Sequence, residues 1–417
     1  MVLSRACRGS PVVVFRLVGS GCVLFFGCER QSMRTVTVLG TTGSIGCSTV
    51  DLLEQARDQF RVRALVGGKN AARLAEQARS LKAELAVLAD EGAYAELKEL
   101  LAGSGVEVAC GRKAVIEAAA LPADWTMAAI TGAAGLEPTL AAVKNGNSIA
   151  LANKEALVCA GDVMLRAVQD AGATLLPVDS EHNAVFQSMA DRQADQVEKI
   201  ILTASGGPFR NASLDVMRAA TPAQALKHPT WSMGAKISID SATMFNKGLE
   251  IIEAARIFGL TEDRIDVLVH PQSVVHGMVQ YTDGSLIAQM GSADMRIPIA
   301  HALAWPQRMA TTSSRLDLAA FGTLEFIAPD EVRFPALRLA RQALRAGKAV
   351  PAILSAANEI AVEAFLKERI GFLDIARVVE DTMTELGAPP ADTLEAVLHW
   401  DAQARRVALH QIAAVAA

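Results

Sequence analysis

Short hydrophobic, β-branched runs recur along the first half of the chain, and longer helical patterns separate them. The runs predict strands at residues 36–39, 62–66, 86–88, 106–109, 127–130 and 148–151. Strands that alternate with helical spans indicate βαβ units and a mostly parallel sheet. We expect this organisation to continue to about Leu176.

The pattern becomes mixed between Asp179 and Trp305. It predicts strands at 199–203, 267–270, 277–279 and 285–288, and helices at 249–258 and 297–303. Glycines and prolines interrupt the pattern between Ser205 and Gly234, where Thr221 before Pro222 indicates a short helix. A long segment with glycines at possible hinges is typical of a lid.

The last part of the chain, from Phe334, is almost entirely helical in pattern. Apolar residues at helical spacing predict helices at 335–346, 351–367, 372–386 and 393–414. The class is therefore α/β, with a mixed central part and a C-terminal helical bundle.

Residues 1–32 differ from the rest of the chain. They contain one acid, Glu29, three of the six cysteines, and an apolar run at 11–27 that Arg16 interrupts. We favour translation that begins at Met33, with a targeting segment or a membrane anchor as alternatives. The other cysteines, Cys47, Cys110 and Cys159, have neither metal nor disulfide spacing, which fits a reducing cytoplasm.

Composition narrows the possible functions. Of the 417 residues, 51% are hydrophobic and 20% charged, which excludes a disordered or collagen-like chain. A formal net charge of −5 gives no electrostatic reason to expect nucleic-acid or anionic-membrane binding. Aromatic residues make up only 5%, so platforms for base stacking are not expected.

Three glycines, Gly40, Gly43 and Gly46, lie between the first strand and the following helix. Glycines there let the backbone approach a pyrophosphate, which the N–H groups of the helix N-terminus then bind. The alternative is a tight turn without a ligand. The second strand ends in the sequence GGKN at residues 67–70, with a cation and no acid, which favours NADP over NAD.

Acidic residues form a second candidate site. Asp179 and Glu181 would share one face of an extended chain and could hold a cation. The alternative is an N-cap and first helical turn. Glu250 or Glu253 could supply a third carboxylate, unless both are solvated helix acids. Oxygen ligands alone select Mg²⁺ or Mn²⁺ over zinc.

Several polar side chains could bind a substrate. Lys154 follows a predicted strand, at the end where open α/β sheets bind ligands, although a single lysine is more often solvated. Potential phosphate donors are Ser205, Ser241, Asn246 and Lys247. No spacing among His182, His228 and His276 indicates zinc, and each could be a buried or loop histidine.

Together these segments resemble the 1-deoxy-D-xylulose 5-phosphate reductoisomerase family of isoprenoid (methylerythritol phosphate) biosynthesis. Eight motifs occur in family order, starting at Gly40, Gly67, Ala152, Val178, Ser205, His228, Ser241 and His270: GTTGSIG, GGKN, ANKE, VDSEHN, SGGPFR, HPTWSMG, SATMFNKGLE and HPQSVVHGMV. Departures from the family pattern are Thr41 for Ser, Thr230 for Asn and Phe245 for Met. Residues 1–32 have no counterpart, which supports a start at Met33.

The resemblance implies a homodimer whose chains each have three domains. A Rossmann-type NADP-binding domain would span 33–178 and a central α+β catalytic domain 179–305, with a lid at 205–235. A linker at 306–330 would lead to the helical domain at 331–417. Trp231 and Met233 would close over the site with the lid.

The resemblance also implies a role for each matched residue. NADPH would be bound by Thr42, Gly43, Ser44, Ile45, Gly68, Lys69, Asn70, Asn153, Glu155 and Gly234. A divalent cation, Mn²⁺ or Mg²⁺, would be held by Asp179, Glu181 and Glu250. The substrate would contact Lys154, Ser180, Glu181 and Glu250 at its reacting part, and Ser205, His228, Ser241, Asn246 and Lys247 at its phosphate. Lys154, Glu181 and Glu250 would be catalytic.

The implied reaction rearranges 1-deoxy-D-xylulose 5-phosphate to a branched aldehyde, which NADPH reduces to 2-C-methyl-D-erythritol 4-phosphate. The expected partners are a sugar phosphate and a second copy of the chain, with no nucleic acid and no membrane. One rival is a semialdehyde dehydrogenase that uses Cys159 as nucleophile. The other is a cofactor-binding regulatory protein without catalysis.

Overall fold

The computed structural model describes residues 33–189, 195–231 and 233–416, so our interpretations of residues 1–32 lie outside the described residues. Within that part, a parallel seven-stranded sheet has the order β4-β3-β2-β1-β5-β6-β7. Its strands are β1 (Arg34–Leu39), β2 (Phe60–Gly67), β3 (Leu85–Leu88), β4 (Glu107–Cys110), β5 (Trp125–Ala128), β6 (Ser148–Leu151) and β7 (Thr174–Pro177). The order reverses between β1 and β5, as in doubly wound folds. The predicted α/β class is confirmed.

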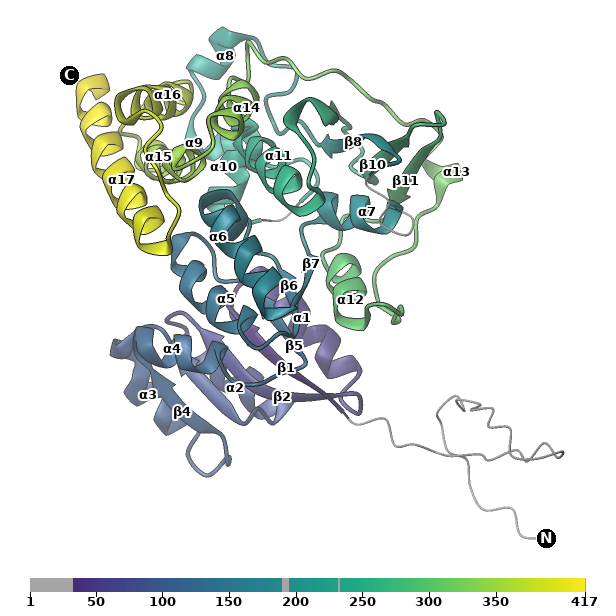
Figure 1. Cartoon of the computed structure of the whole chain (residues 1–417), viewed down its shortest axis with the longest axis vertical. Helices are drawn as coiled ribbons and strands as arrows, with labels where there is room; N and C mark the ends of the chain where they lie inside the picture. Colours follow the sequence, from purple (N-terminus) through teal and green to yellow (C-terminus); the bar gives the residue numbers. More distant parts are fainter. Residues whose placement is uncertain (1–32, 190–194, 232, 417) are drawn as a thin grey trace, which may run out of the picture.

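Helices cover both faces of this sheet (Figure 1). The helices between its strands are α1 (Ser44–Gln55), α2 (Ala71–Leu81), α3 (Tyr94–Leu100), α4 (Gly111–Ala119), α5 (Leu136–Val143) and α6 (Glu155–Ala171). One apolar core joins α1, α2 and α3 to the sheet, and another joins α4, α5 and α6. The strands in the middle of the sheet, such as β1 and β5, are largely buried, which explains their continuous apolar runs.

The predicted strands lie close to those of the structure, with one omission. β5 begins two residues before the predicted run, at Trp125, and ends at Ala128. The strand that we missed is β7, which pairs parallel with β6. Only Leu175 and Leu176 are strongly apolar in this run, which ends at Pro177, so the sequence carries a weak strand signal there.

A smaller sheet forms the central part, with the order β11-β10-β8-β9. Its strands are β8 (Val197–Ala204), β9 (Ile265–Val269), β10 (Val275–Tyr281) and β11 (Leu286–Met290). Helices α7 (Ser180–Ser188) and α11 (Phe245–Phe258) pack on it. α7 lies very close to β10, because a Cβ on Gly277 would be 2.9 Å from the main-chain oxygen of Glu181. Glycine at this position therefore sets how near the acidic helix approaches the sheet.

Short helices mark the segment predicted as a lid. They are α8 (Leu214–Arg218) and α9 (Pro222–Ala225), followed by α10 (Ala235–Thr243), which we did not predict. The short helix predicted from the Thr221-Pro222 pair is α9, and Thr221 and Gln224 form a capping box at its start.

The chain then returns to the first sheet. α12 (Arg296–Ala304) packs there, with the Trp125 indole N–H donating to the Ala302 carbonyl at 3.0 Å. α13 (Leu318–Phe321) follows in the segment predicted as a linker. The C-terminal end of the predicted central domain therefore packs against the first sheet, whose strands all precede that domain.

The C-terminal helices are α14 (Ala336–Ala346), α15 (Val350–Leu366), α16 (Asp374–Leu386) and α17 (Leu394–Ala416), close to the predicted bounds. In Figure 1 they lie beside α10 and α11, on the side away from β11. One apolar core includes residues of β8, β9, α11 and α14–α16. The small sheet and the C-terminal helices therefore share a single core.

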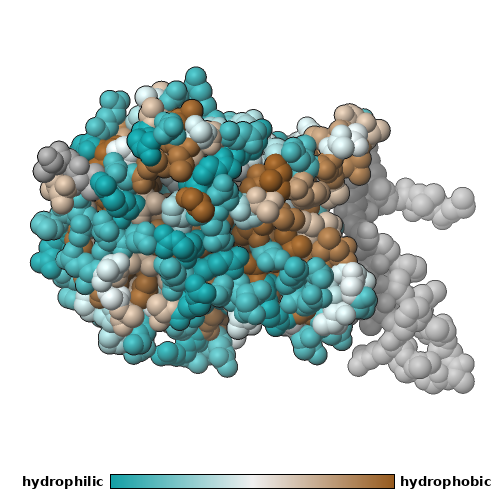
Figure 2. Space-filling view, turned by 90° about the horizontal axis from the view of Figure 1, so that it is seen from above, coloured by the Kyte–Doolittle hydropathy of each residue, from teal (hydrophilic) through white to brown (hydrophobic). Residues whose placement is uncertain are grey.

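Hydrophobic side chains on the surface occur in separate patches among hydrophilic ones on the face shown in Figure 2. Among the described residues, no helix combines the length and the apolar character needed to cross a membrane.

Candidate active site

The candidate residues meet at the carboxyl edge of the large sheet. The glycine turn follows β1, Lys154 follows β6, and Asp179 follows β7. Ligands bind at this edge in open α/β sheets because the strand ends and helix N-termini converge there. A cavity of about 560 Å³ lies between this edge, the small sheet and the segment before α10.

The glycine turn leaves the N-terminus of α1 free to bind an anion. Gly43 caps α1, no side chain accepts from its first N–H groups, and its first turn contains no acid. Such an end attracts a phosphate through its N–H groups and its dipole. Ser44 and Ile45 line the cavity.

The other predicted cofactor residues occupy four places. Lys69 is exposed after β2, next to Asn70, whose side chain caps α2 by accepting from the Arg73 N–H at 3.0 Å. The Asn153 amide instead contacts the chain itself, donating to the Gly132 carbonyl at 3.1 Å. Thr42 and Gly43 lie in the turn, Gly68 after β2, Glu155 at the start of α6, and Gly234 in the cavity wall.

Three carboxylates converge deeper in the cavity. One oxygen from each of Asp179, Glu181 and Glu250 lies within 4.8 Å of the others. The helical alternative for the acidic motif is correct: Asp179 is the N-cap of α7 and Glu181 lies in its first turn, so the extended alternative is wrong. The N-terminus of α7 carries Asp179 and Glu181, and α11 carries Glu250, so the acids meet between two helices.

Two lysines neutralise this acidic group. Lys154 Nζ lies 2.9 Å from Asp179 Oδ2 and 3.5 Å from Glu250 Oε1. Lys247 Nζ lies 2.8 Å from Glu181 Oε1 and also pairs with Glu250. Burial opposes the charged form of both lysines, but the neighbouring carboxylates outweigh it and raise the pKa of each ammonium.

The carboxyl groups themselves differ in acidity. Burial, with the adjacent Glu181 carboxylate, raises the pKa of Glu250 to about 8, although Lys247 acts in the opposite direction. Burial would also raise the pKa of Asp179, but Lys154 outweighs it and lowers that pKa. One fully buried carboxyl thus lies beside an acid that stays ionised.

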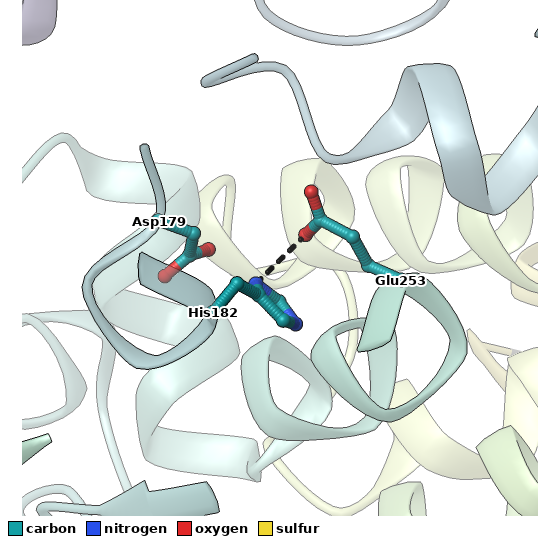
Figure 3. A group of neighbouring side chains, drawn as sticks. All are labelled: Asp179, His182 and Glu253. Carbon is teal, nitrogen blue, oxygen red and sulfur yellow. Dashed lines mark ion pairs between the residues drawn. The ribbon is translucent and has the colours of Figure 1, made fainter. Parts of the chain in front are cut away.

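Glu253 belongs to a neighbouring buried group (Figure 3). Its Oε2 lies 3.4 Å from His182 Nδ1, while His182 Nε2 is 2.9 Å from the Glu250 main-chain oxygen. A carbonyl oxygen can only accept, so His182 donates from Nε2. The carboxylate of Glu253 faces His182, which favours Glu250 as the third oxygen ligand.

A hydroxyl donor is prepared at the other end of the cavity. His228 Nδ1 accepts from the Trp231 N–H at 2.8 Å, so Nε2 carries the proton and donates to Ser205 Oγ at 2.8 Å. Ser205 Oγ also accepts from the Gly207 N–H at 3.2 Å, which leaves its own O–H free for a ligand. Burial lowers the pKa of His228. This end can therefore donate to an anionic oxygen.

The expected phosphate residues separate into two sets. Ser205, His228 and Ser241 line one part of the cavity, whereas Asn246 and Lys247 contact the acidic group. Asn246 accepts from Lys154 Nζ at 2.6 Å and donates to Glu250. A motif identifies such residues but does not fix the direction of their side chains.

The cavity wall also contains residues that we did not single out, among them Ser273, Ser292, Asp294, Met295 and Arg296. Residues 292–296 lead into α12, which begins at Arg296, and their sequence SADMR carries no recognised chemical signal. His276, which we predicted as a buried or loop histidine, is buried and lines the wall as well.

The donor set suits a hard cation. The converging group of Asp179, Glu181 and Glu250 offers carboxylate oxygens alone, the ligands that Mg²⁺ and Mn²⁺ prefer. Cys159 does not suit the rival role of a nucleophile. It is buried in α6, and burial raises the pKa of its thiol, so the reactive thiolate is disfavoured.

Comparison with known proteins gives one consistent result. Family models described as 1-deoxy-D-xylulose 5-phosphate reductoisomerase match residues 36–161, and models of its C-terminal domains match 175–258 and 290–407. A relative from Gluconobacter oxydans, named 1-deoxy-D-xylulose 5-phosphate reductoisomerase, is 70% identical over 383 residues, 92% of this chain and 94% of its own. One of the same name from Rhodospirillum centenum is 59% identical over 92% of this chain and 96% of its own.

Solved structures similar to this chain lead to the same family. The Zymomonas mobilis enzyme of that name, in complex with NADPH, has a TM-score of 0.88 at 53% identity and covers 91% of this chain and 99% of its own. A DOX-P reductoisomerase in complex with NADPH, fosmidomycin and magnesium has a TM-score of 0.87 at 42% identity, with 91% and 98% covered.

Proposed function

Because this chain belongs to the 1-deoxy-D-xylulose 5-phosphate reductoisomerase family, we propose that its cavity converts 1-deoxy-D-xylulose 5-phosphate to 2-C-methyl-D-erythritol 4-phosphate. The enzyme is an NADP-dependent reductoisomerase of isoprenoid precursor biosynthesis and requires a divalent cation. The observation that carries the proposal is the cavity itself, where an anion-binding helix end, a group of three carboxylates and a prepared serine donor face one space.

NADPH lies across the carboxyl edge of the large sheet in this proposal. The turn residues Thr42, Gly43, Ser44 and Ile45 bind its pyrophosphate, and Gly68, Lys69 and Asn70 bind the 2′-phosphate side. Asn153, Glu155 and Gly234 complete the site towards the substrate. The cofactor supplies the hydride, and Lys69 provides the cation that distinguishes NADPH from NADH.

Asp179, Glu181 and Glu250 hold the divalent cation. When bound, Mg²⁺ or Mn²⁺ supplies Lewis-acid polarisation of substrate oxygens. Lys154 stays protonated because its carboxylate neighbours raise its pKa, so it donates to oxygens that gain negative charge. Ser180 orients Glu181 through the hydrogen bond from its hydroxyl.

The phosphate end of the substrate lies against Ser205, His228 and Ser241, with Asn246 and Lys247 between it and the acidic group. Binding there, away from the reacting carbons, orients the substrate. Trp231 and Met233 line the cavity from the segment before α10 and exclude water when the lid closes.

The enzyme works as a homodimer in the cytoplasm in this proposal. The edge strand β11 supports dimerisation, because Leu286 and Ile287 on it are 53% and 44% exposed. An exposed apolar edge strand is a template for pairing with another chain. The cysteines of the described residues, Cys47, Cys110 and Cys159, are unpaired, which fits a reducing compartment.

The test is an assay of the full chain with 1-deoxy-D-xylulose 5-phosphate. NADPH oxidation should require Mg²⁺ or Mn²⁺ after EDTA treatment, and NMR should identify 2-C-methyl-D-erythritol 4-phosphate. Glu250→Gln should abolish turnover and weaken Mn²⁺ binding with an unchanged circular dichroism spectrum. Glu198→Gln, an exposed acid on β8, is the matched control. NADPH oxidation at the same rate with and without the metal, or full activity of Glu250→Gln, would overturn the assignment.

A further inference from the structure

Gln77 is a buried amide in α2 that contacts the glycine turn and has no part in the roles proposed above. It is 6% exposed and lies 36 residues from Thr41 in the sequence. Its Nε2 donates to the Thr41 carbonyl at 3.0 Å, and its Oε1 accepts from Thr41 Oγ1 at 2.9 Å. The same Nε2 lies 3.6 Å from Cys47 Sγ, in the first turn of α1. A single side chain therefore satisfies both polar groups of Thr41 that face α2.

Thr41 is enclosed from three directions. Its N–H donates to the Val66 carbonyl at the end of β2, at 2.9 Å. A Cβ added to Gly46 would lie 2.4 Å from the Thr41 Cα, so α1 touches the turn backbone directly. Gln77 closes the third side. Because β2, α1 and α2 all contact Thr41, they restrict the orientation of the peptide that follows it.

That orientation determines how the turn presents its N–H groups. In a planar trans peptide, the carbonyl of one residue and the N–H of the next point in opposite directions. The Thr41 carbonyl points to Gln77, and consequently the Thr42 N–H points away from α2. Thr42 is the first residue of the set assigned to the cofactor. The hydrogen bond from Gln77 thus orients the first donor of the turn.

Gln77 also connects the two cofactor segments. The loop at residues 67–70 leads into α2, and Gln77 lies on the buried face of that helix. The turn after β1 and the loop after β2 are therefore joined by this side chain as well as by the strands. We propose that Gln77 is a positioning residue for NADPH, holding the pyrophosphate turn in its binding form and in register with the 2′-phosphate loop.

The chemistry of the amide makes the proposal specific. The Thr41 carbonyl needs a donor and the Thr41 hydroxyl needs an acceptor, and the carboxamide of Gln77 supplies both. Gln77→Glu keeps the acceptor and loses the donor, whereas Gln77→Leu loses both. Thr41→Ser keeps the hydroxyl, and Thr41→Val removes it. These four variants separate the hydrogen bonds from the packing.

The experiment measures NADPH affinity by nucleotide fluorescence on the full chain without substrate, together with the KM of each ligand. Gln77→Leu and Gln77→Glu should raise the Kd for NADPH about tenfold, since the buried Thr41 carbonyl loses its amide donor and keeps only the weak contact from Cys47 Sγ at 3.7 Å. Thr41→Val should also raise the Kd, whereas Thr41→Ser should keep wild-type affinity because it keeps the hydroxyl. The KM for the sugar phosphate should stay within about twofold, because Gln77 does not line the cavity.

A matched control distinguishes positioning from general loss of stability. Thr382→Val removes a buried hydroxyl that donates to Val378 in α16, far from the turn, and should lower the thermal midpoint without changing the Kd. The inference rests on the proposed cofactor role: a wild-type chain that fails to bind NADPH would refute that role. If wild type binds and Gln77→Leu binds equally well, or both KM values rise together, the inference about Gln77 is wrong.

Discussion

Two lysines contact the three acids of the acidic group. Asp179 has Lys154, Glu181 has Lys247, and Glu250 contacts both ammonium groups. Removing one partner of a buried charge pair is costly, because the remaining charge keeps its desolvation penalty. Lys154 and Lys247 are therefore part of the structure of this site as well as candidates for its chemistry.

Lys69 offers a test of cofactor choice at the residue scale. Lys69→Ala should raise the KM for NADPH about tenfold and leave the KM for NADH nearly unchanged, because only NADPH has the 2′-phosphate. The exposed Lys98 on α3 supplies the control Lys98→Ala. Equal NADPH kinetics in Lys69→Ala and wild type would remove Lys69 from the cofactor site.

His301 predicts a dependence of stability on pH. Burial, with a contribution from Arg308, lowers the pKa of this α12 imidazole to about 4, and its Nδ1 lies 3.1 Å from Asn183 Nδ2. Between pH 6.5 and 4 the unfolded chain binds a proton that the folded chain does not, so stability falls as the pH falls. Allowing for solvent screening, the loss is about 1–2 kcal/mol.

Urea unfolding of wild type and His301→Gln at pH 7 and pH 4.5 measures the loss of stability that His301 causes. Glutamine can accept from Asn183 but does not titrate, so the variant should lose less stability between the two pH values. An identical pH dependence in both proteins would show that His301 does not titrate in this range.

At the scale of elements, the sequence predicts what hydrophobic periodicity alone determines. The strands from β1 to β6 and the C-terminal helices have continuous apolar runs or stripes, so their positions were close to correct. β7 is short and ends in proline, and α10 directly follows a stretch of glycine and proline, so neither carries a strong local pattern. These elements depend on contacts with distant residues.

The candidate site was also predicted only in part, because motifs identify residues but do not show how distant helices pack. Motifs identified Asp179, Glu181 and Glu250, and the structure brings them together. The pairing of Lys247 with Glu181 could not be predicted, because it depends on how α7 and α11 pack on the small sheet. Gln77 was missed as well, since a single glutamine in an amphipathic helix gives no chemical signal.

The connection between β1 and α1 depends on close approach at Gly46. A Cβ there would lie 2.3 Å from the Gly40 carbonyl oxygen, whereas a Cβ on Gly43 would be 3.4 Å from the same atom. Gly46→Ala should therefore lower the free energy of unfolding by about 3 kcal/mol, as expected for overpacking. Gly43→Ala should cost about 1 kcal/mol or less. Denaturant unfolding measures the free energy of unfolding of both variants. Similar losses would contradict the close approach at Gly46.

At the scale of the whole molecule, the small sheet shares its core with the C-terminal helices, while α12 packs on the large sheet. The cavity therefore lies between the large sheet and the small sheet, and the segments on either side of α12 run between them. Closure of the site would involve these segments and the lid together.

The exposed edge of the small sheet predicts the oligomeric state. Ile287→Asp should weaken the proposed dimer, because a charge would replace an apolar side chain on β11. Sedimentation equilibrium should show a rise in the dimer dissociation constant of about tenfold or more. Val216→Asp, at a 55% exposed position on α8, is the control and should leave the dimer intact. A dimer unaffected by Ile287→Asp would place the interface elsewhere.

Residues 153–155, where the connection from β6 enters α6, have a practical consequence for recombining this enzyme with its relatives. Asn153 and Glu155 are proposed for NADPH and Lys154 between them for the substrate, so neighbouring peptide units serve two different ligands. An insertion or deletion of one residue here would change the direction of all three side chains, so both proposed ligands would lose contacts. Chimeras should therefore inherit residues 152–156 as one block, with crossover points placed in the exposed turns between α4 and β5 or between α6 and β7.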